Sequence, residues 1–282
     1  MKAFQRSLVL PPPAKRYRQR AVRKPDGSKR LVYEPCEVLR QIQDSLLPEL
    51  WKKLPASEYS HGRPGRSIVT HAKVHSNPAV LVTMDLDSFF QRVTGLHVKR
   101  VFEAAFPNTS VDRLVEYCMM PKQDCLATGA PTSPALADAV YAGADWYLAE
   151  VATSKGWRYS RYVDDMAFSL ANPADDLVGR AESLISVIRG VSAAFGFPVN
   201  ALKTQVRFPE DRQEVTGLIV NGGAPRAPRE TWKRLRGGVH RVEVGRPVDL
   251  ESLQGLLSFL QMLDKKKAES YARRLKDAVS KE

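Results

Sequence analysis

The segment Arg161-Tyr162-Val163-Asp164-Asp165-Met166-Ala167-Phe168-Ser169 carries two adjacent carboxylates between runs of apolar and aromatic residues. The pattern predicts two strands within residues 158–170 that meet at a tight turn, with both carboxylates at its tip. Adjacent like charges repel, and their neutral forms are favoured unless a cation compensates them. A solvated turn without function is the alternative, but the apolar flanks would fix this pair on a rigid platform beside a core.

A third carboxylate, Asp85, ends the apolar run from Ala79 to Met84, which is typical of a buried strand. Asp85 would then lie at a sheet edge, unless it caps a helix that begins just after Asp85 or Asp87. Three carboxylates on two strands can hold two Mg²⁺ ions, because magnesium prefers oxygen ligands and keeps several waters. Such a pair of ions suits phosphoryl transfer.

The rest of the chain mixes strand and helix signals. A hairpin is predicted at 21–33 around the turn 25–28, and short strands at 206–208 and 217–220. Helices are predicted at about 37–50, 98–106, 111–119 and 177–195, and after a loop at 129–134. In that last helix one stripe holds Leu136, Val140, Tyr147 and Val151. A basic helical region follows from about 228, where Asp249 could cap an amphipathic helix.

The composition favours a globular protein that binds a polyanion. The chain has 282 residues, of which 43% are hydrophobic and 26% charged, and its formal net charge is +12. Residues 1–30 carry ten Lys or Arg against Asp26, and residues 226–246 carry seven against Glu230 and Glu243. Cationic side chains release counterions when they bind phosphate, so nucleic acid is the favoured partner and a solvated basic surface the alternative.

Membrane and secretory signals are not evident in the sequence. There is no run of about 18 apolar residues, and the short apolar run at 8–10 precedes three prolines. The three cysteines, Cys36, Cys118 and Cys125, form no Cys-x-x-Cys pair. They indicate a reducing cytoplasm, with neither a disulfide framework nor a zinc site.

At the carboxylates the sequence resembles reverse transcriptases. That family carries a Tyr-x-Asp-Asp hairpin, here 162–165, and an earlier aspartate followed five residues later by an aromatic residue, here Asp85 and Phe90. The resemblance implies catalysis by three aspartates and two Mg²⁺ ions held by Asp85, Leu86, Asp164 and Asp165. It also implies that Phe90 is a steric gate against the ribonucleotide 2′-OH. The alternative is that Phe89 and Phe90 are core residues.

Three further segments resemble parts of the same family that hold the incoming nucleotide. The loop 127–134 is similar to a glycine-rich loop, which implies nucleotide contacts by Thr128, Gly129 and Ala130; the usual residue at 128 is glutamine. Lys203, in 196–204, is expected near the triphosphate, with a surface lysine as the alternative. Arg30, in the early hairpin, is expected to hold phosphates, a task that suits a guanidinium.

Two features resemble the retron branch of the family. Val215-Thr216-Gly217 matches a retron triplet, and His71-Ala72-Lys73-Val74-His75 matches Asn-Ala-x-x-His except at His71. His71 and His75 are four residues apart and could hold a metal ion, but a structural or RNA-contact role is favoured. In the basic C-terminal region, RNA or DNA contacts are expected from Arg226, Arg229, Trp232, Lys233 and Arg236. The alternative is an amphipathic helix whose basic face is only solvated.

The sequence therefore predicts an α+β right-hand polymerase. Fingers would comprise about 1–78 with 96–124, the palm the remaining segments to 224 with an antiparallel sheet backed by helices, and 225–282 a small basic helical thumb. The retron resemblance implies that the enzyme copies its own structured noncoding RNA into a branched RNA–DNA product from deoxynucleoside triphosphates. It further implies a guanosine 2′-OH as primer, a role in phage defence, a bacterial cytoplasmic location and a separate effector protein.

Two rival functions remain open at this stage. One is another bacterial reverse transcriptase, related to group II introns or to defence without a retron RNA; the triplet at 215–217 argues against it. The other is a polymerase-like module that holds RNA without turnover, against which the three intact aspartates argue. Magnesium is favoured over manganese by hard oxygen ligands and abundance.

Overall fold

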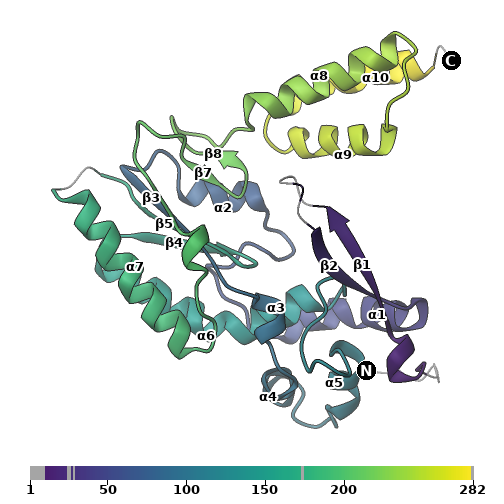
Figure 1. Ribbon diagram of the computed structural model, residues 1–282, viewed down its shortest axis with the longest axis vertical. Helices are drawn as coiled ribbons and strands as arrows, with labels where there is room; N and C mark the ends of the chain where they lie inside the picture. The colour runs from purple at the N-terminus through teal and green to yellow at the C-terminus, as the bar shows by residue number, and fades with distance from the viewer. Residues whose placement is uncertain (1–9, 24–26, 28, 173–174, 281–282) are drawn as a thin grey trace.

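The protein is described here by a computed structural model that covers residues 10–23, 27, 29–172 and 175–280. Its centre is a four-stranded antiparallel sheet in the order β4-β5-β3-β6 (Figure 1). The strands are β3 (Val80–Asp85), β4 (Arg158–Tyr162), β5 (Asp165–Leu170) and β6 (Gln205–Arg207). The expected hairpin within 158–170 is confirmed, since β4 and β5 pair directly.

Two long helices cover one face of this sheet. Val80, Val82 and Met84 alternate toward that face and share one core with residues of α6 (Ser133–Ser154) and α7 (Leu177–Ala194). The predicted stripe on α6 is not the buried face of the helix, because its member Tyr147 is 50% exposed. Alanines supply much of the buried surface instead, which lets α6 lie close to its neighbours.

The opposite face of the sheet is partly covered by α2 (Ile68–Val74) and the small hairpin of β7 (Glu214–Val215) and β8 (Leu218–Ile219). A separate apolar cluster joins Leu81 and Ala167 of the sheet to side chains of α2 and β8. The domain division predicted from the sequence assigned residues 1–78, which include α2, to the fingers. The apolar side chains of α2 pack against the sheet. Strand β7 was not anticipated, because two residues carry too little periodicity to detect.

The N-terminal part forms a second layer beside the sheet (Figure 1). It contains the hairpin of β1 (Tyr17–Arg23) and β2 (Lys29–Pro35), followed by α1 (Glu37–Lys53), α4 (Gly95–Ala105) and α5 (Asp112–Cys118). Two short helical turns, η2 (Pro13–Lys15) and α3 (Phe89–Arg92), lie at its borders. Both strands are longer than predicted, and of the predicted turn at 25–28 only Gly27 lies within the described residues.

Three helices form the C-terminal part: α8 (Arg229–Glu243), α9 (Leu250–Gln261) and α10 (Lys265–Val279). They share their own apolar cluster, and Phe259 of α9 also packs against the cluster around α2. The predicted cap is confirmed, because the Asp249 carboxylate accepts a hydrogen bond from the Ser252 amide at 3.0 Å. The boundary between 224 and 225 stays a prediction.

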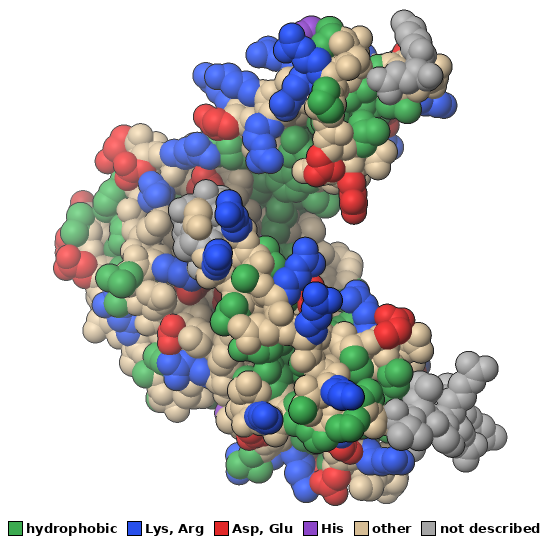
Figure 2. Space-filling view, turned by 45° about the vertical axis from the view of Figure 1, so that its right-hand side comes forward, with side chains coloured by type: hydrophobic (Ala, Val, Ile, Leu, Met, Phe, Trp, Pro, Cys, Tyr) green, Lys and Arg blue, Asp and Glu red, His purple; other side chains and the backbone are tan. Residues whose placement is uncertain are grey.

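The arrangement is the mixed α+β fold that the sequence predicts, with helices backing an antiparallel sheet. Figure 2 shows a hollow between the C-terminal helices and the rest of the molecule, with Lys and Arg side chains gathered on both sides of it. Within the described chain, every helix is too short or too polar to cross a membrane. The hollow is where a long polyanion could reach the sheet.

Candidate active site

The candidate site lies where the last residue of β3 pairs with the first residue of β5. Asp85 and Asp165 are direct partners in the antiparallel register, although eighty positions separate them in the chain. The Leu86 amide donates to the Asp164 carbonyl at 2.9 Å, which ties the residue after β3 to the β4–β5 turn. The N-cap alternative for Asp85 and Asp87 is wrong, because Ser88 is the residue that precedes α3.

The turn between β4 and β5 contains only Val163 and Asp164, since Tyr162 pairs with Asp165. Val163 has a φ of 57°, in the left-handed region that a β-branched residue rarely adopts. Two-residue hairpin turns need positive φ at their first central residue, which glycine or asparagine usually supplies. The geometry that exposes the two carboxylates is therefore maintained by surrounding contacts and not by local preference.

The three carboxylates repel one another. Burial, followed by the charge of Asp85, raises the pKa of Asp164. Burial, followed by the charges of Asp164 and Asp85, raises the pKa of Asp165 to about 7. Carboxylates destabilised in this way gain from a nearby divalent cation, and their hard oxygens are the donors that Mg²⁺ prefers.

Lys203 supplies one positive charge at this site. Its Nζ lies 2.8 and 2.9 Å from the two carboxylate oxygens of Asp85, and this pairing raises the lysine pKa. In the described chain no three Asp, Glu, His or Cys side chains are gathered closely enough to hold a metal ion as they stand. Asp85 is instead paired with Lys203, which the sequence placed near the triphosphate.

Backbone contacts bring the lysine segment to the carboxylates. The Asn200 amide donates to the Asp85 carbonyl at 2.8 Å, and Val199 forms an isolated bridge with Leu86. The Asn200 side chain then accepts from the Leu202 amide and begins the short turn η3 (Ala201–Lys203). The segment 196–204 is thus an extension of the sheet edge.

The two phenylalanines after Asp85 have different surroundings. Phe89 is 2% exposed and packs edge-on against Tyr141 and Phe197, so it belongs to the core. Phe90 is only partly buried and packs at the border of that core. Of the pair, Phe90 is therefore the one that remains available to meet a nucleotide.

The loop expected to support the nucleotide rests on the β1–β2 hairpin. A Cβ at Gly129 would lie 2.7 Å from a methyl of Val32 and 2.9 Å from the Tyr33 carbonyl oxygen, so only glycine fits. The Thr128 hydroxyl donates to the Leu31 carbonyl at 3.3 Å. The Ala130 side chain is 5% exposed, so any nucleotide contact there would come from backbone atoms.

Arg30 lies on the exposed surface of β2, and its positive charge acts to lower the pKa of Asp164. The role of Arg30 in holding phosphates stays a prediction.

The direct RNA contacts expected for His71 and His75 are corrected by the structure, because neither side chain is exposed. His75 hydrogen-bonds to the Ser160 and Ser169 hydroxyls, each at 2.8 Å. His71 lies 3.3 Å from the Ser160 carbonyl and 3.5 Å from the Thr216 hydroxyl. The structural role is favoured, and it joins the two retron-like motifs to each other.

The candidate nucleic-acid contacts of the C-terminal part differ in accessibility. Trp232 is partly buried, and Lys267 Nζ lies 4.0 Å from its ring centre, so one face of this ring is already taken. The stacking on a base that the sequence suggested for Trp232 is therefore disfavoured. The four candidate cations are exposed, namely Arg226, Arg229, Lys233 and Arg236.

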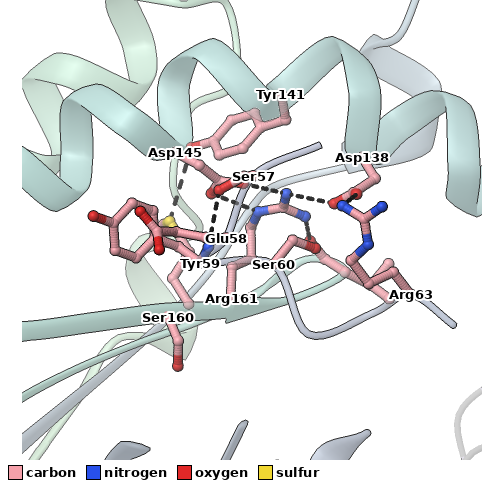
Figure 3. A network of polar contacts seen from close by, with 12 residues as sticks. Ser57, Glu58, Tyr59, Ser60, Arg63, Asp138, Tyr141, Asp145, Ser160 and Arg161 are labelled. Carbon is pink, nitrogen blue, oxygen red and sulfur yellow. Dashed lines mark hydrogen bonds and ion pairs between the residues drawn. The ribbon is translucent and has the colours of Figure 1, made fainter. Parts of the chain in front are cut away.

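Sequence reasoning missed a buried ionic network directly behind the turn (Figure 3). Arg161 is 1% exposed and pairs with Asp145 and Asp138 of α6. The signal was present in the sequence, because two aspartates seven residues apart on an otherwise apolar helix lie on one face of it. Buried acids on such a face need a cationic partner.

Comparison with known proteins agrees with this geometry. Residues 22–233 match the family model described as "Reverse transcriptase (RNA-dependent DNA polymerase)". The Retron Mx162 reverse transcriptase of Myxococcus xanthus is 31% identical over 99% of this chain and 63% of its own length. The Retron Ec86 reverse transcriptase of Escherichia coli is 30% identical over 89% of this chain and 78% of its own.

A third retron relative and a solved telomerase are also similar to this chain. The Retron Mx65 reverse transcriptase of Myxococcus xanthus is 34% identical over 91% of this chain, which again spans 63% of the relative. A solved telomerase from Candida albicans, in complex with a fragment of telomeric RNA, aligns over 94% of this chain and 58% of that chain. Its TM-score is 0.49 and its identity 12%. The chain belongs to the reverse transcriptase family, among the retron reverse transcriptases.

Proposed function

We propose that the chain is an RNA-directed DNA polymerase that adds deoxynucleotides to a primer at Asp85, Asp164 and Asp165. The pairing of Asp85 with Asp165 at the ends of β3 and β5 carries the proposal. Two bound Mg²⁺ ions, held by these carboxylates and the backbone at Leu86, would activate the attacking hydroxyl and stabilise the leaving pyrophosphate. No general base is needed, because positioning and charge stabilisation dominate this chemistry.

The chain's own cations act on the triphosphate in this proposal. Lys203 is already within hydrogen-bond distance of Asp85, so a small movement would carry its ammonium from that carboxylate to a phosphate. Arg30, exposed on β2, would supply a second cation. Gly129 lets the loop before α6 lie against the β1–β2 hairpin. The partly buried Phe90 would then meet the sugar of the nucleotide.

The finer function we infer is synthesis of branched multicopy single-stranded DNA from a structured noncoding RNA that primes through a guanosine 2′-OH. It is supported by the retron relatives and by the contact of the retron-like segments at His71 and Thr216. Recognition by shape and phosphate contacts suits the basic rims of the hollow in Figure 2. A separate effector protein, phage defence and the bacterial cytoplasm complete the proposal.

Primer extension on an RNA template tests the polymerase assignment. Asp165→Asn should abolish incorporation, whereas Asp112→Asn, an exposed aspartate paired with Lys99 on the fingers, should not. Equal incorporation by wild type and Asp165→Asn would refute the site.

Sequencing the nucleic acid that copurifies with the chain tests the retron assignment. A branched RNA–DNA species identifies a retron product. An active preparation without it favours a reverse transcriptase of another bacterial type.

A further inference from the structure

Behind the turn that carries Asp164 and Asp165, one buried guanidinium makes contacts with all three of its nitrogens. Arg161 Nε donates to Asp145 at 2.8 Å, and Nη2 to Asp145 and Asp138 at 2.5 and 2.9 Å. The remaining nitrogen, Nη1, donates to the carbonyl oxygen of Val163 at 2.7 Å. The same side chain therefore joins helix α6 to the first central residue of the turn.

The residue that receives this bond is the strained one. Val163 has a φ of 57°, and its side chain is held against Gly62, where an added Cβ would lie 2.9 Å from Val163 Cγ2. The loop that carries Gly62 is itself bound to β4, because the His61 amide donates to the Arg161 carbonyl at 2.7 Å. Such a backbone conformation persists only where its surroundings over-determine it.

The carboxylates keep the guanidinium charged and oriented. Burial by itself lowers the pKa of Arg161, but the charge and hydrogen bonds of Asp145, with Asp138, raise it well above its ordinary value. Asp145 also accepts from the Tyr159 hydroxyl at 2.6 Å. A planar fork fixed at both of its other nitrogens can present Nη1 in one direction only.

We propose that Arg161 is a positioning residue, which holds the Val163 carbonyl from behind the sheet so that Asp164 and Asp165 keep the geometry needed to bind divalent cations. The inference rests on the proposed function of those two carboxylates. Arg161 touches neither substrate nor metal, and it acts as an outer support of the metal ligands. Such supports commonly affect metal affinity as strongly as they affect turnover.

The first test is primer extension by Arg161→Lys across a Mg²⁺ titration. Lysine keeps the charge opposite Asp145 but lacks the fork, so the Mg²⁺ concentration for half-maximal rate should rise about tenfold and kcat should fall similarly. The KM for primer–template should change less than about twofold, because the nucleic-acid contacts lie elsewhere. A merely structural role would lower the folded fraction without moving the Mg²⁺ midpoint.

The matched control is Arg16→Lys. Arg16 is also buried, and its guanidinium donates to the Pro11 carbonyl and to the Glu116 carboxylate. It lies in the N-terminal part, which was predicted to form the fingers. Its Mg²⁺ midpoint should stay at the wild-type value. An equal shift in both variants would show a general effect of losing a buried guanidinium and would overturn the proposal.

A second variant covers the case in which Arg161→Lys fails to fold. Arg161→Met/Asp145→Asn leaves no uncompensated charge, because Asp138 keeps Arg63 at 3.9 Å. Cooperative unfolding near the wild-type temperature with a wild-type Mg²⁺ midpoint would overturn the proposal. Loss of cooperative unfolding in both variants would show a role in folding alone and would also overturn it.

The Asp165→Asn variant separates this inference from the function on which it rests. If Asp165→Asn is inactive and the folded Arg161 variants behave as wild type, only the positioning role fails. If Asp165→Asn keeps full activity, the metal site itself is wrong, whatever the Arg161 variants do.

Discussion

Lys203 Nζ lies 2.8 Å from one carboxylate oxygen of Asp85 and 2.9 Å from the other, so one ammonium neutralises the acid that ends β3. The contact joins residues 118 positions apart and is made at the surface, with 55% of the lysine side chain exposed. A cation there competes with metal for the same carboxylate. In the proposed function, the lysine moves from this carboxylate to a phosphate of the bound nucleotide.

Replacement of Lys203 should therefore separate metal binding from turnover. In Lys203→Ala we expect half-maximal activity at a lower Mg²⁺ concentration, because the competing charge is gone. The maximal rate should nevertheless fall by roughly 100-fold, if the lysine assists pyrophosphate departure. Single-turnover extension over a Mg²⁺ titration measures both, with Lys203→Arg as the charge-preserving control. A higher Mg²⁺ requirement in Lys203→Ala would contradict the competition.

The two phenylalanines after β3 should respond in opposite ways. Phe90→Ala should reduce the preference for deoxynucleotides over ribonucleotides by roughly 10- to 100-fold, measured as the ratio of kcat/KM values. Phe89→Ala should leave that preference unchanged but lower the free energy of unfolding by about 3–5 kcal/mol, because it empties a buried site. If a folded Phe90→Ala variant kept the wild-type preference for deoxynucleotides, Phe90 would not be the steric gate.

Gly129 offers a test of the contact between the nucleotide loop and the β1–β2 hairpin. Gly129→Ala would place a methyl 2.9 Å from the Tyr33 carbonyl oxygen, so the loop must move away. We expect a higher KM for the deoxynucleotide and a loss of about 1–3 kcal/mol of stability. The control is Gly143→Ala on α6, where the methyl meets nothing within 4 Å and helix stability should rise by about 0.5–1 kcal/mol.

The buried histidines predict loss of stability in mild acid. Burial and a neighbouring cation lower the pKa of His61 to about 4. Burial and His61 lower the pKa of His71 to about 3. Burial and His71 lower the pKa of His75 well below its ordinary value. The unfolded chain takes up these protons first, near pH 6.5, so stability is present above that pH and is lost below it. The charged groups facing the three rings are all cationic, namely Arg66, Arg161 and Arg158.

Urea unfolding between pH 8 and pH 5 measures this effect. Each histidine should account for about 2 kcal/mol of lost stability at pH 5, since the unfolded form is then protonated and the folded form is not. His75→Gln should flatten the pH dependence, and His240→Gln, at an exposed position of α8, should not. Equal slopes for His75→Gln and wild type would show that His75 is charged in the folded chain.

The sequence alone predicted the strand that ends at Asp85 and the strand that follows the turn at Asp164 and Asp165, because their apolar runs and the short turn are local signals. It likewise determined the Asp249 cap, which one side chain and one nearby amide create. These features depend on residues close together in the chain, where spacing carries the information. The family motifs in their order then identified the chemistry.

The surroundings of the carboxylates follow from how distant parts of the chain pack together. This packing buried His71 and His75, covered one face of Trp232 with Lys267, and set Arg161 between α6 and the turn. Each of these outcomes depends on which distant surface a side chain meets, and the same residue would be exposed or buried in another packing. Burial and charge compensation are properties of the assembled fold, so the spacing of Asp138 and Asp145 indicates that a buried cation should pair with them but not which one.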